Sequence, residues 1–171
     1  MALLKIIEFP DPKLRQRASE VTVFDNKLRT TCGDMLETMY NARGIGLAAI
    51  QVNILKRIVV IDLSEEKNKP LIFINPEIIK VSDDTKRYGE GCLSVPGIYE
   101  NVTRPNSFIG KYYDLDGHDH QLEADGLLSV CLQHEIDHLN GCVFVDHLSR
   151  LKQEKIIRKL HKEKRRSLAE A

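Results

Sequence analysis

Residues 131–141, CLQHEIDHLNG, constrain the fold most, because they place two histidines and a glutamate in a segment that otherwise has the pattern of a buried helix. We expect this helix to span residues 126–140, with Asp125 as its N-cap and Gly141 at its end. Its apolar residues leave little face for solvent; they are Leu127, Leu128, Val130, Cys131, Leu132, Ile136 and Leu139. Imidazoles and carboxylates cost free energy when they are buried without partners. The fold must therefore contain something that satisfies them.

The spacing of these three polar residues indicates a metal site. On a helix, His134 and His138 lie on one face, about 6 Å apart along the axis, so both can reach one metal ion. Glu135 is the next residue round and can reach a water on that ion without being a ligand. The pattern HExxH therefore supplies two ligands and a general base. The alternative, a surface helix with two unrelated histidines, disagrees with the apolar flanks.

A catalytic metal site also needs a third protein ligand and an open position for water. One class of metallopeptidase, which cleaves internal peptide bonds, carries the longer pattern HExxHxxGxxH. Here Gly141 falls in the right place, but the last position is Phe144, which cannot bind a metal. The third ligand must therefore come from another part of the chain.

Cysteine is the remaining candidate for this ligand. On the helix, Cys131 and Cys142 are each displaced by about 7 Å from the level midway between the histidines, too far for a metal–sulfur bond. Cys32 lies in the apolar stripe of an earlier helix, which indicates core packing. Cys92 lies in the glycine-rich stretch YGEGCLSVPG, a turn or bulge where the backbone can approach closely. Cys92 is therefore the favoured third ligand, although a cysteine in such a turn is often structural.

A third segment, GIGLAAIQV, is also unusual. Gly44 and Gly46 can form a helix stop and a loop of close approach, although an ordinary turn has the same pattern. Gln51 carries amide N–H donors that can stabilise an oxyanion. A lone glutamine is more often only a polar surface residue.

Three segments thus stand in the order GIGLAAIQ (44–51), EGCLS (90–94) and QHEIDH (133–138). They resemble the three signature motifs of peptide deformylases, and FPDPKLRQRA resembles the opening of that family. The likeness covers most of residues 4–160. It implies a metal-dependent hydrolase that removes the formyl group from the N-terminal formylmethionine of new bacterial proteins and releases formate.

The resemblance also implies roles for individual residues. The metal ligands are Cys92, His134 and His138, the general acid and base is Glu135, and the oxyanion donors are the Gln51 side chain and the Leu93 backbone N–H. The metal is ferrous iron, one per chain, which Zn²⁺, Ni²⁺ or Co²⁺ can replace; ligand softness alone would favour zinc. The methionine pocket comprises Ile45, Leu127, Val130, Cys131 and the ring of Tyr88. The substrate backbone pairs near Gly46 and Gly97.

Length and periodicity indicate a single α+β domain over residues 1–171, with antiparallel or mixed β-sheets around the HExxH helix. An N-terminal helix over residues 25–42 is expected, with Asp25 as N-cap and Gly44 as its stop. A C-terminal helix follows Ser149. The expected strands are 57–63, 71–81 with a kink at Pro76, and the hairpin 107–115 and 118–124 around Asp116-Gly117. Glu90 is a candidate ion-pair partner of Arg104.

The formal net charge is zero, but residues 150–166 hold nine Lys or Arg and two Glu, a local net of +7. The helix and tail over about 149–171 can be a solvated charged helix or, given the origin of a formylated substrate on the ribosome, a ribosome-docking surface.

The start MALLKIIEFPDP meets Pro and Asp too early for a signal peptide. We therefore expect a cytoplasmic protein with reduced cysteines and no membrane span, acting as a monomer on formylmethionyl peptides and nascent chains.

Two further alternatives remain open at this point. A thiol hydrolase would use Cys92 as nucleophile with a histidine base, and it would survive chelators. A non-enzymatic domain would use the metal to hold its fold and dock a partner through the basic helix. A closed structural site normally has four protein ligands, whereas only three are found here.

Overall fold

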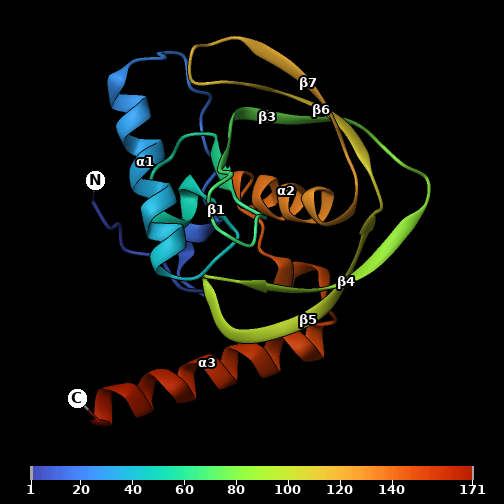
Figure 1. Ribbon diagram of the computed structural model, residues 1–171. Helices are drawn as coiled ribbons and strands as arrows, with labels where there is room; N and C mark the ends of the chain where they lie inside the picture. Colours follow the sequence, from blue (N-terminus) through green and yellow to red (C-terminus); the bar gives the residue numbers. More distant parts are fainter. Residues whose placement is uncertain (1, 171) are drawn as a thin grey trace.

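The structure is a computed structural model that describes residues 2–170, so Met1 and Ala171 lie outside the described part (Figure 1). The helix α1 spans Asn26–Asn41, and the Asp25 carboxylate caps it by accepting the Leu28 N–H at 3.0 Å. The predicted N-cap and range are confirmed. The buried face of α1, which includes Cys32, packs on the sheet as the apolar stripe predicts.

Two antiparallel sheets make up the β part of the fold. The larger has five strands in the order β1-β2-β3-β6-β7, and the smaller pairs β4 with β5. The strands are β1 Gly46–Ala48, β2 Ile58–Ile61, β3 Leu71–Val81, β4 Thr85–Cys92, β5 Val95–Pro105, β6 Phe108–Tyr113 and β7 Asp119–Ala124. The predicted strand 71–81 is confirmed, and the pairing of β3 with β6 shifts register between Ile74 and Glu77, at the expected kink. Gly117 turns the predicted hairpin with φ of 83°.

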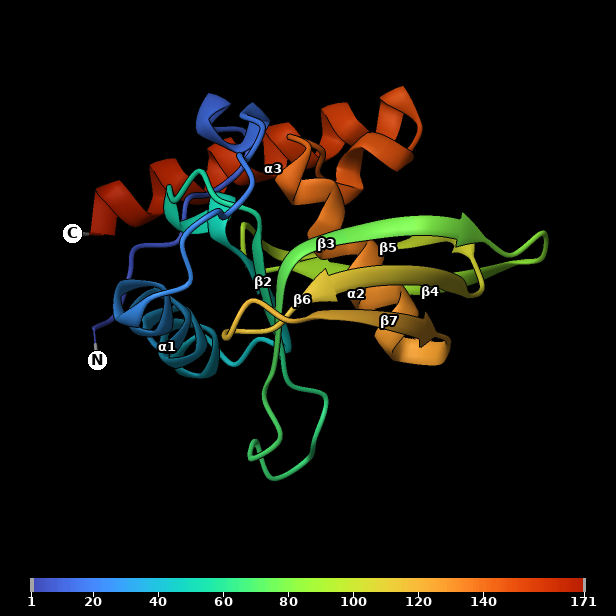
Figure 2. The same cartoon turned by 90° about the horizontal axis from the view of Figure 1, so that it is seen from above.

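The helix α2, Gly126–Leu139, lies between the two sheets, with β3, β6 and β7 on one side and β4 and β5 on the other (Figures 1 and 2). Ten of its 14 residues are buried. Asp125 occupies the N-cap, but its side chain makes no capping hydrogen bond. Gly141 ends the helix region with φ of 80°, and a Cβ there would lie 2.6 Å from the Arg15 carbonyl oxygen. The central HExxH helix is therefore confirmed.

Three strands were not predicted from the sequence: β1, β4 and β5. The expected turn around Cys92 is instead the end of β4, where the pairing with β5 shifts register between Glu90 and Cys92. The predicted helix stop at Gly44 is wrong, because α1 ends at Asn41 and the left-handed residue is Arg43, with φ of 60°. Three short 3₁₀ helices complete the chain, at Pro12–Arg15, Ala49–Val52 and Phe144–His147.

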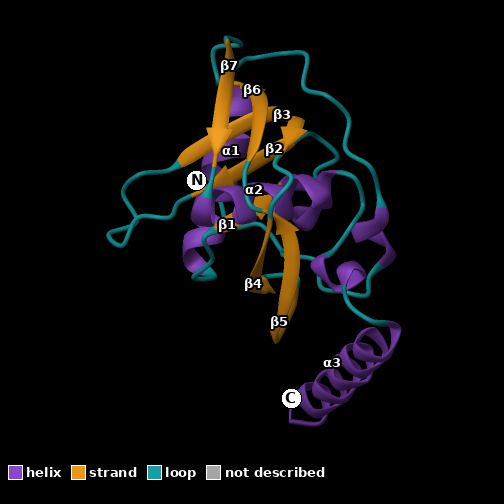
Figure 3. Ribbon diagram, turned by 90° about the vertical axis from the view of Figure 1, so that its right-hand side faces the viewer, coloured by secondary structure: helices purple, strands orange, loops and turns teal. Residues whose placement is uncertain are grey.

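The last helix, α3, spans Arg150–Glu170 and lies along the outside of the molecule (Figure 3), with its first turns beside β5 (Figure 1), where Lys152 pairs with Glu100 at 3.3 Å. Ile156 and Leu160 are buried against the body, whereas Leu151 is 60% exposed. Every residue from 161 to 169 is exposed. Among residues 2–170, no helix has both the length and the apolar character that crossing a membrane requires.

Candidate active site

The three sequence motifs meet at one cavity of about 530 Å³. The loop after α1 and β1 supplies one wall, the end of β4 and start of β5 supply another, and α2 forms the floor. The lining includes these predicted site residues: Ile45, Gly46, Gln51, Cys92, Leu93, Gly97, Leu127, Val130, Cys131, His134 and Glu135. His138 is fully buried beneath them. Segments far apart in the sequence therefore converge as the motifs predict.

Tyr88 is the exception, because it does not line this cavity. The Lys86 ammonium lies 5.1 Å from the centre of its ring, and both residues belong to the same face of β4. Glu90, two residues further on the same face, does line the cavity, so Tyr88 lies one repeat of the strand further away from it. Tyr88 therefore lies outside the lining of this cavity.

Three potential ligand atoms converge below this cavity. Single donor atoms of Cys92, His134 and His138 all lie within 4.8 Å of one another, and the Cys92 Sγ is 3.3 Å from His138 Nε2. Ligands around one tetrahedral ion stand about 3.5 Å apart, given bonds of about 2.0–2.3 Å. One thiolate and two imidazoles are a donor set that suits a divalent transition metal. The residues present therefore fit a metal ion and leave coordination positions for small molecules.

A buried ion pair orients one of these imidazoles. The Glu90 carboxylate lies 3.0 Å from His134 Nδ1, which leaves His134 Nε2 to face the converging donors. Arg104 donates to both Glu90 oxygens, at 2.6 and 2.9 Å, so the predicted pair of Glu90 and Arg104 is confirmed. Burial alone would raise the pKa of Glu90, but the hydrogen bonds from His134 and Arg104 outweigh it and hold the pKa at about 2. The carboxylate therefore stays ionised beside the site.

This network continues to residues that the sequence did not single out. Arg104 also donates to Asp137 at 2.8 Å, and His147 lies 3.0 Å from the same Asp137 oxygen. Asp137 stands between the two histidines of the motif, one position before His138. The position of Asp137 inside the HExxH motif was the one sequence feature that pointed to it. The spacing of the motif does not predict that its side chain contacts Arg104 on β5.

The two histidines differ in their proton affinity. Burial lowers the pKa of His138 well below its usual value, so this imidazole is neutral and able to bind a metal. Its Nδ1 is buried without a hydrogen-bond partner among the described residues. Burial also disfavours the charged form of His134, but its hydrogen bonds to Cys92 and Glu90 raise the pKa well above the usual value. Metal binding requires the neutral form of both imidazoles, and Glu90 is one of the groups that favour the charged form of His134.

Glu135 is placed beside the converging donors and is not one of them. Its Oε1 lies 3.8 Å from His134 Nε2 and 4.0 Å from His138 Nε2. Burial raises the pKa of this carboxyl to about 7, a value suited to a group that exchanges protons near neutral pH. The close approach requires Gly46, because a Cβ at that position would lie 2.9 Å from Glu135 Oε2.

Gln51 is buried and held in one orientation. Its Oε1 accepts the Ala48 backbone N–H at 2.9 Å, so its amide nitrogen must point the other way. That nitrogen lies 3.0 Å from Ser94 Oγ and 3.5 Å from Cys92 Sγ. The side chain is therefore not a surface residue, and its donors face the end of β4 beside the cavity.

The other cysteines and Phe144 lie where the spacing arguments put them. Cys131 lines the cavity wall, and Cys142 lies beyond the end of α2; neither belongs to the converging group. Cys32 is fully buried, and burial raises the pKa of its thiol to about 12. All four cysteines are free thiols. The Phe144 ring stacks on His134 with centroids 5.9 Å apart, so the extended metallopeptidase pattern has no ligand there.

The site thus combines a buried carboxylate with one cysteine and two histidine donors at the base of an open cavity. This arrangement is typical of metal-dependent hydrolases. Residues 3–154 match the polypeptide deformylase family. The chain is 57% identical over 165 residues to the peptide deformylase of Pseudomonas aeruginosa, covering 96% of this chain and 98% of that protein. It is 56% identical over 163 residues to peptide deformylase 1 of Pseudomonas syringae pv. tomato, covering 95% and 97%.

Solved structures agree with these sequence matches. The crystal structure of peptide deformylase from Ehrlichia chaffeensis superposes with a TM-score of 0.93 at 39% identity, covering 98% of this chain and 99% of that one. The peptide deformylase from Legionella pneumophila gives 0.91 at 45% identity, covering 98% of each chain. The chain belongs to the polypeptide deformylase family, whose enzymes remove the N-formyl group from nascent peptides.

The ligand geometry predicts a difference among the cysteines. We expect Cys92→Ala to lose most of its bound metal, because a histidine pair alone is a weaker site. Cys131→Ala and Cys142→Ala should retain it, because neither sulfur belongs to the converging group. Metal content of the purified variants, measured by atomic emission, checks this. Normal metal loading in Cys92→Ala would show that another residue is the third ligand.

Proposed function

We propose that this chain removes the formyl group from the N-terminal formylmethionine of new proteins, with Cys92, His134 and His138 holding the metal that the reaction needs. The observation that carries the proposal is the convergence of these donors beside Glu135 at the base of a cavity open to a peptide. When bound, a divalent metal would supply Lewis acidity and lower the pKa of a coordinated water. The remaining chemistry falls to residues of the chain.

Glu135 acts as the proton carrier. In the ionised form its carboxylate accepts a proton from the attacking water, and it then delivers that proton to the amine nitrogen as the bond to the formyl carbon breaks. Its pKa of about 7 suits both halves of this transfer. The products are formate and a free N-terminus.

The negative charge that develops on the formyl oxygen is stabilised by two donors of the chain. The Gln51 amide is pre-oriented by its bond to Ala48, so it does not have to reorganise during the reaction. The Leu93 backbone N–H is the second donor, and it lies in the turn between β4 and β5 next to Cys92.

The methionine side chain enters the apolar part of the cavity, between Ile45, Leu127, Val130 and Cys131. Ile45 and Leu127 are 38% and 48% exposed, so they form its rim, while Val130 and Cys131 are buried. The strand β1 is an edge strand of the large sheet. The peptide backbone pairs with this strand at Gly46 and with the segment around Gly97.

We further propose ferrous iron as the metal in the cell, with zinc, nickel or cobalt able to replace it. The support is the family membership, because one thiolate and two imidazoles accept any of these ions. Protein purified without oxygen should contain iron as its main metal. A thiolate next to ferrous iron is oxidisable, so the iron form should lose activity in air faster than the nickel form. Zinc as the sole metal of the anaerobic protein would contradict this assignment.

The role of Glu135 predicts a specific defect. Glu135→Gln keeps the shape of the side chain and removes its ability to carry the proton. We expect metal content near that of the wild type and kcat/KM on a formyl-Met peptide lower by at least about a hundredfold. Turnover near the wild-type rate in a variant with full metal content would rule out the proposed role.

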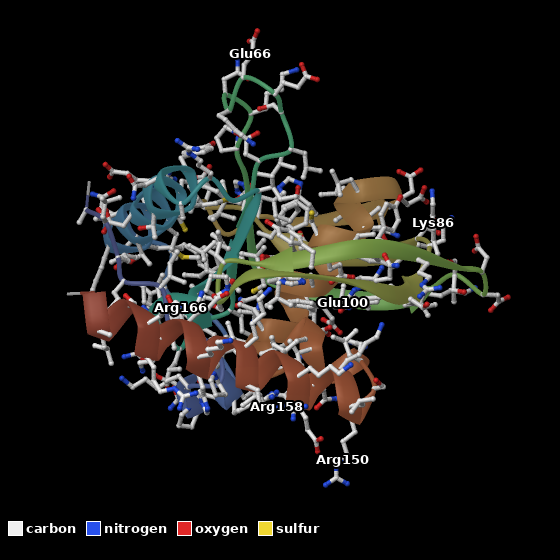
Figure 4. The ribbon with its side chains drawn as sticks, turned by 90° about the horizontal axis from the view of Figure 1, so that it is seen from below. Glu66, Lys86, Glu100, Arg150, Arg158 and Arg166 are labelled. Carbon is white, nitrogen blue, oxygen red and sulfur yellow. The ribbon has the colours of Figure 1, made fainter. Side chains whose placement is uncertain are left out.

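The basic helix α3 suits docking on the ribosome, where formylated chains emerge. Arg150, Arg158 and Arg166 lie along this helix, and Arg150 projects away from the body (Figure 4). Its later turns, 161–169, are wholly exposed and carry Lys162, Lys164, Arg165 and Arg166. We propose that they bind ribosomal RNA phosphates, and that the enzyme works in the cytoplasm as a monomer, which cell fractionation and light scattering would check.

If α3 docks the enzyme on the ribosome, removal of its exposed turns should weaken ribosome binding and leave peptide hydrolysis intact. Removal of residues 161–171 should weaken co-sedimentation with ribosomes, and the wild-type affinity should fall steeply between low and moderate salt. Hydrolysis of a short formyl-Met peptide should change little, because the cavity lies elsewhere. Equal ribosome binding by the full-length and truncated proteins would reject the docking role.

A further inference from the structure

Arg43 has a backbone conformation that its side chain does not favour. It follows the end of α1 with φ of 60°, in the left-handed region, and its N–H donates to the Tyr40 carbonyl at 3.0 Å. Helices that end in this way usually place glycine there, because a Cβ makes the conformation strained. Gly44 is only one residue away, so the chain places an arginine where a glycine would be free of strain. Such strain is often retained where a side chain is needed for function.

The position of Arg43 gives that side chain a use. It lines the mouth of the active-site cavity, is exposed, and takes part in none of the ion pairs between the described residues. The other exposed side chains of this mouth are uncharged and mostly apolar: Ile45, Pro96, Leu127 and Tyr99, the last 77% exposed. Gly91 leaves room for the Tyr99 ring in this position, because a Cβ there would lie 2.5 Å from it. Arg43 is therefore an unpaired cation on an otherwise uncharged rim.

A purely structural role at the end of α1 does not explain why Arg43 keeps a strained conformation. A cation near a helix C-terminus interacts favourably with the helix dipole, and α1 has no basic residue in its last turn. That interaction is weak at an exposed site and no larger than the strain of the left-handed conformation. A lysine or arginine within the last turn would give the same benefit without strain.

We propose that Arg43 is a specificity residue that favours formylated chains with an acidic side chain at the second or third position. This inference rests on the proposed function, because it needs the methionine in the apolar part of the cavity. The chain then leaves through the mouth, and the residues that follow methionine pass the rim. A guanidinium binds a carboxylate through two parallel N–H donors. The described residues of the rim offer Arg43 no carboxylate, so an Asp or Glu of the substrate can be its partner.

Matched peptides test the proposal. Formyl-Met-Glu-Ser-amide is compared with formyl-Met-Gln-Ser-amide, and formyl-Met-Ala-Glu-amide with formyl-Met-Ala-Gln-amide; the amide removes the terminal carboxylate. The readout is the ratio of kcat/KM for the Glu and Gln members of each pair. For the wild type at low salt we expect a ratio of about two to five in at least one pair, the range of an exposed ion pair. The ratio should decline toward one as salt is added.

Variants assign the preference to this residue. Arg43→Gln should bring the ratio to about one, Arg43→Lys should keep it above one, and Arg43→Glu should bring it below one. Arg87→Gln is the matched control, since Arg87 is an exposed arginine on β4 outside the cavity lining, and it should keep the wild-type ratio. Because each ratio is taken within one variant, a change in the folded fraction cancels.

A wild-type ratio of one in both pairs, or a ratio that Arg43→Gln leaves unchanged, would overturn this inference while the deformylase activity stands. A ratio lost equally in Arg87→Gln would also overturn it, because the cause would then be the general field of the protein. If the wild type hydrolyses none of the four peptides, the proposed function itself is rejected.

Discussion

The buried ion pair between Arg104 and Glu90 holds this structure together at its centre. Arg104 belongs to β5, Glu90 to β4 and their further partners, His134 and Asp137, to α2, so one charged cluster joins the small sheet to the helix. Each partner satisfies a group that could not be buried alone, and removal of one partner of such a pair typically costs about 3–5 kcal/mol. The same cluster fixes which nitrogen of His134 faces the site. Folding and ligand orientation therefore depend on one set of contacts.

The apolar core surrounds this cluster and makes its geometry rigid. The helix α2 is covered by the large sheet on one side and by β4 and β5 on the other, which excludes water from Glu135 and raises its pKa. Small residues allow the approach, because Gly46 leaves room for the Glu135 carboxylate and Gly44 for the Leu93 side chain. The glycines of the first motif thus serve packing around the chemistry rather than turns.

Local patterns in the sequence predicted the parts of the fold that depend on short-range spacing. The helices α1 and α2, the strand β3 and the hairpin of β6 and β7 follow from periodicity, caps and Asp116-Gly117. The strands β4 and β5 escaped prediction because glycines and charged residues interrupt their alternation. Cys92 could be inferred only by elimination, and Asp137 not at all, because its partner is an arginine 33 residues away. Tyr88 lies outside the cavity lining although Glu90, on the same face of β4, belongs to it, because the cavity covers only the end of that strand.

The strand β1 has only three residues and lies at the edge of the large sheet. Its outer backbone groups are unpaired within that sheet, and a strand this short offers too little edge for another folded chain to add to it. A ligand that docks there is held mainly through main-chain atoms, which every polypeptide shares. Contacts of this main-chain kind do not discriminate between side chains, and few of them must break before a product can leave. An enzyme that acts on nascent peptides of many sequences benefits from both properties.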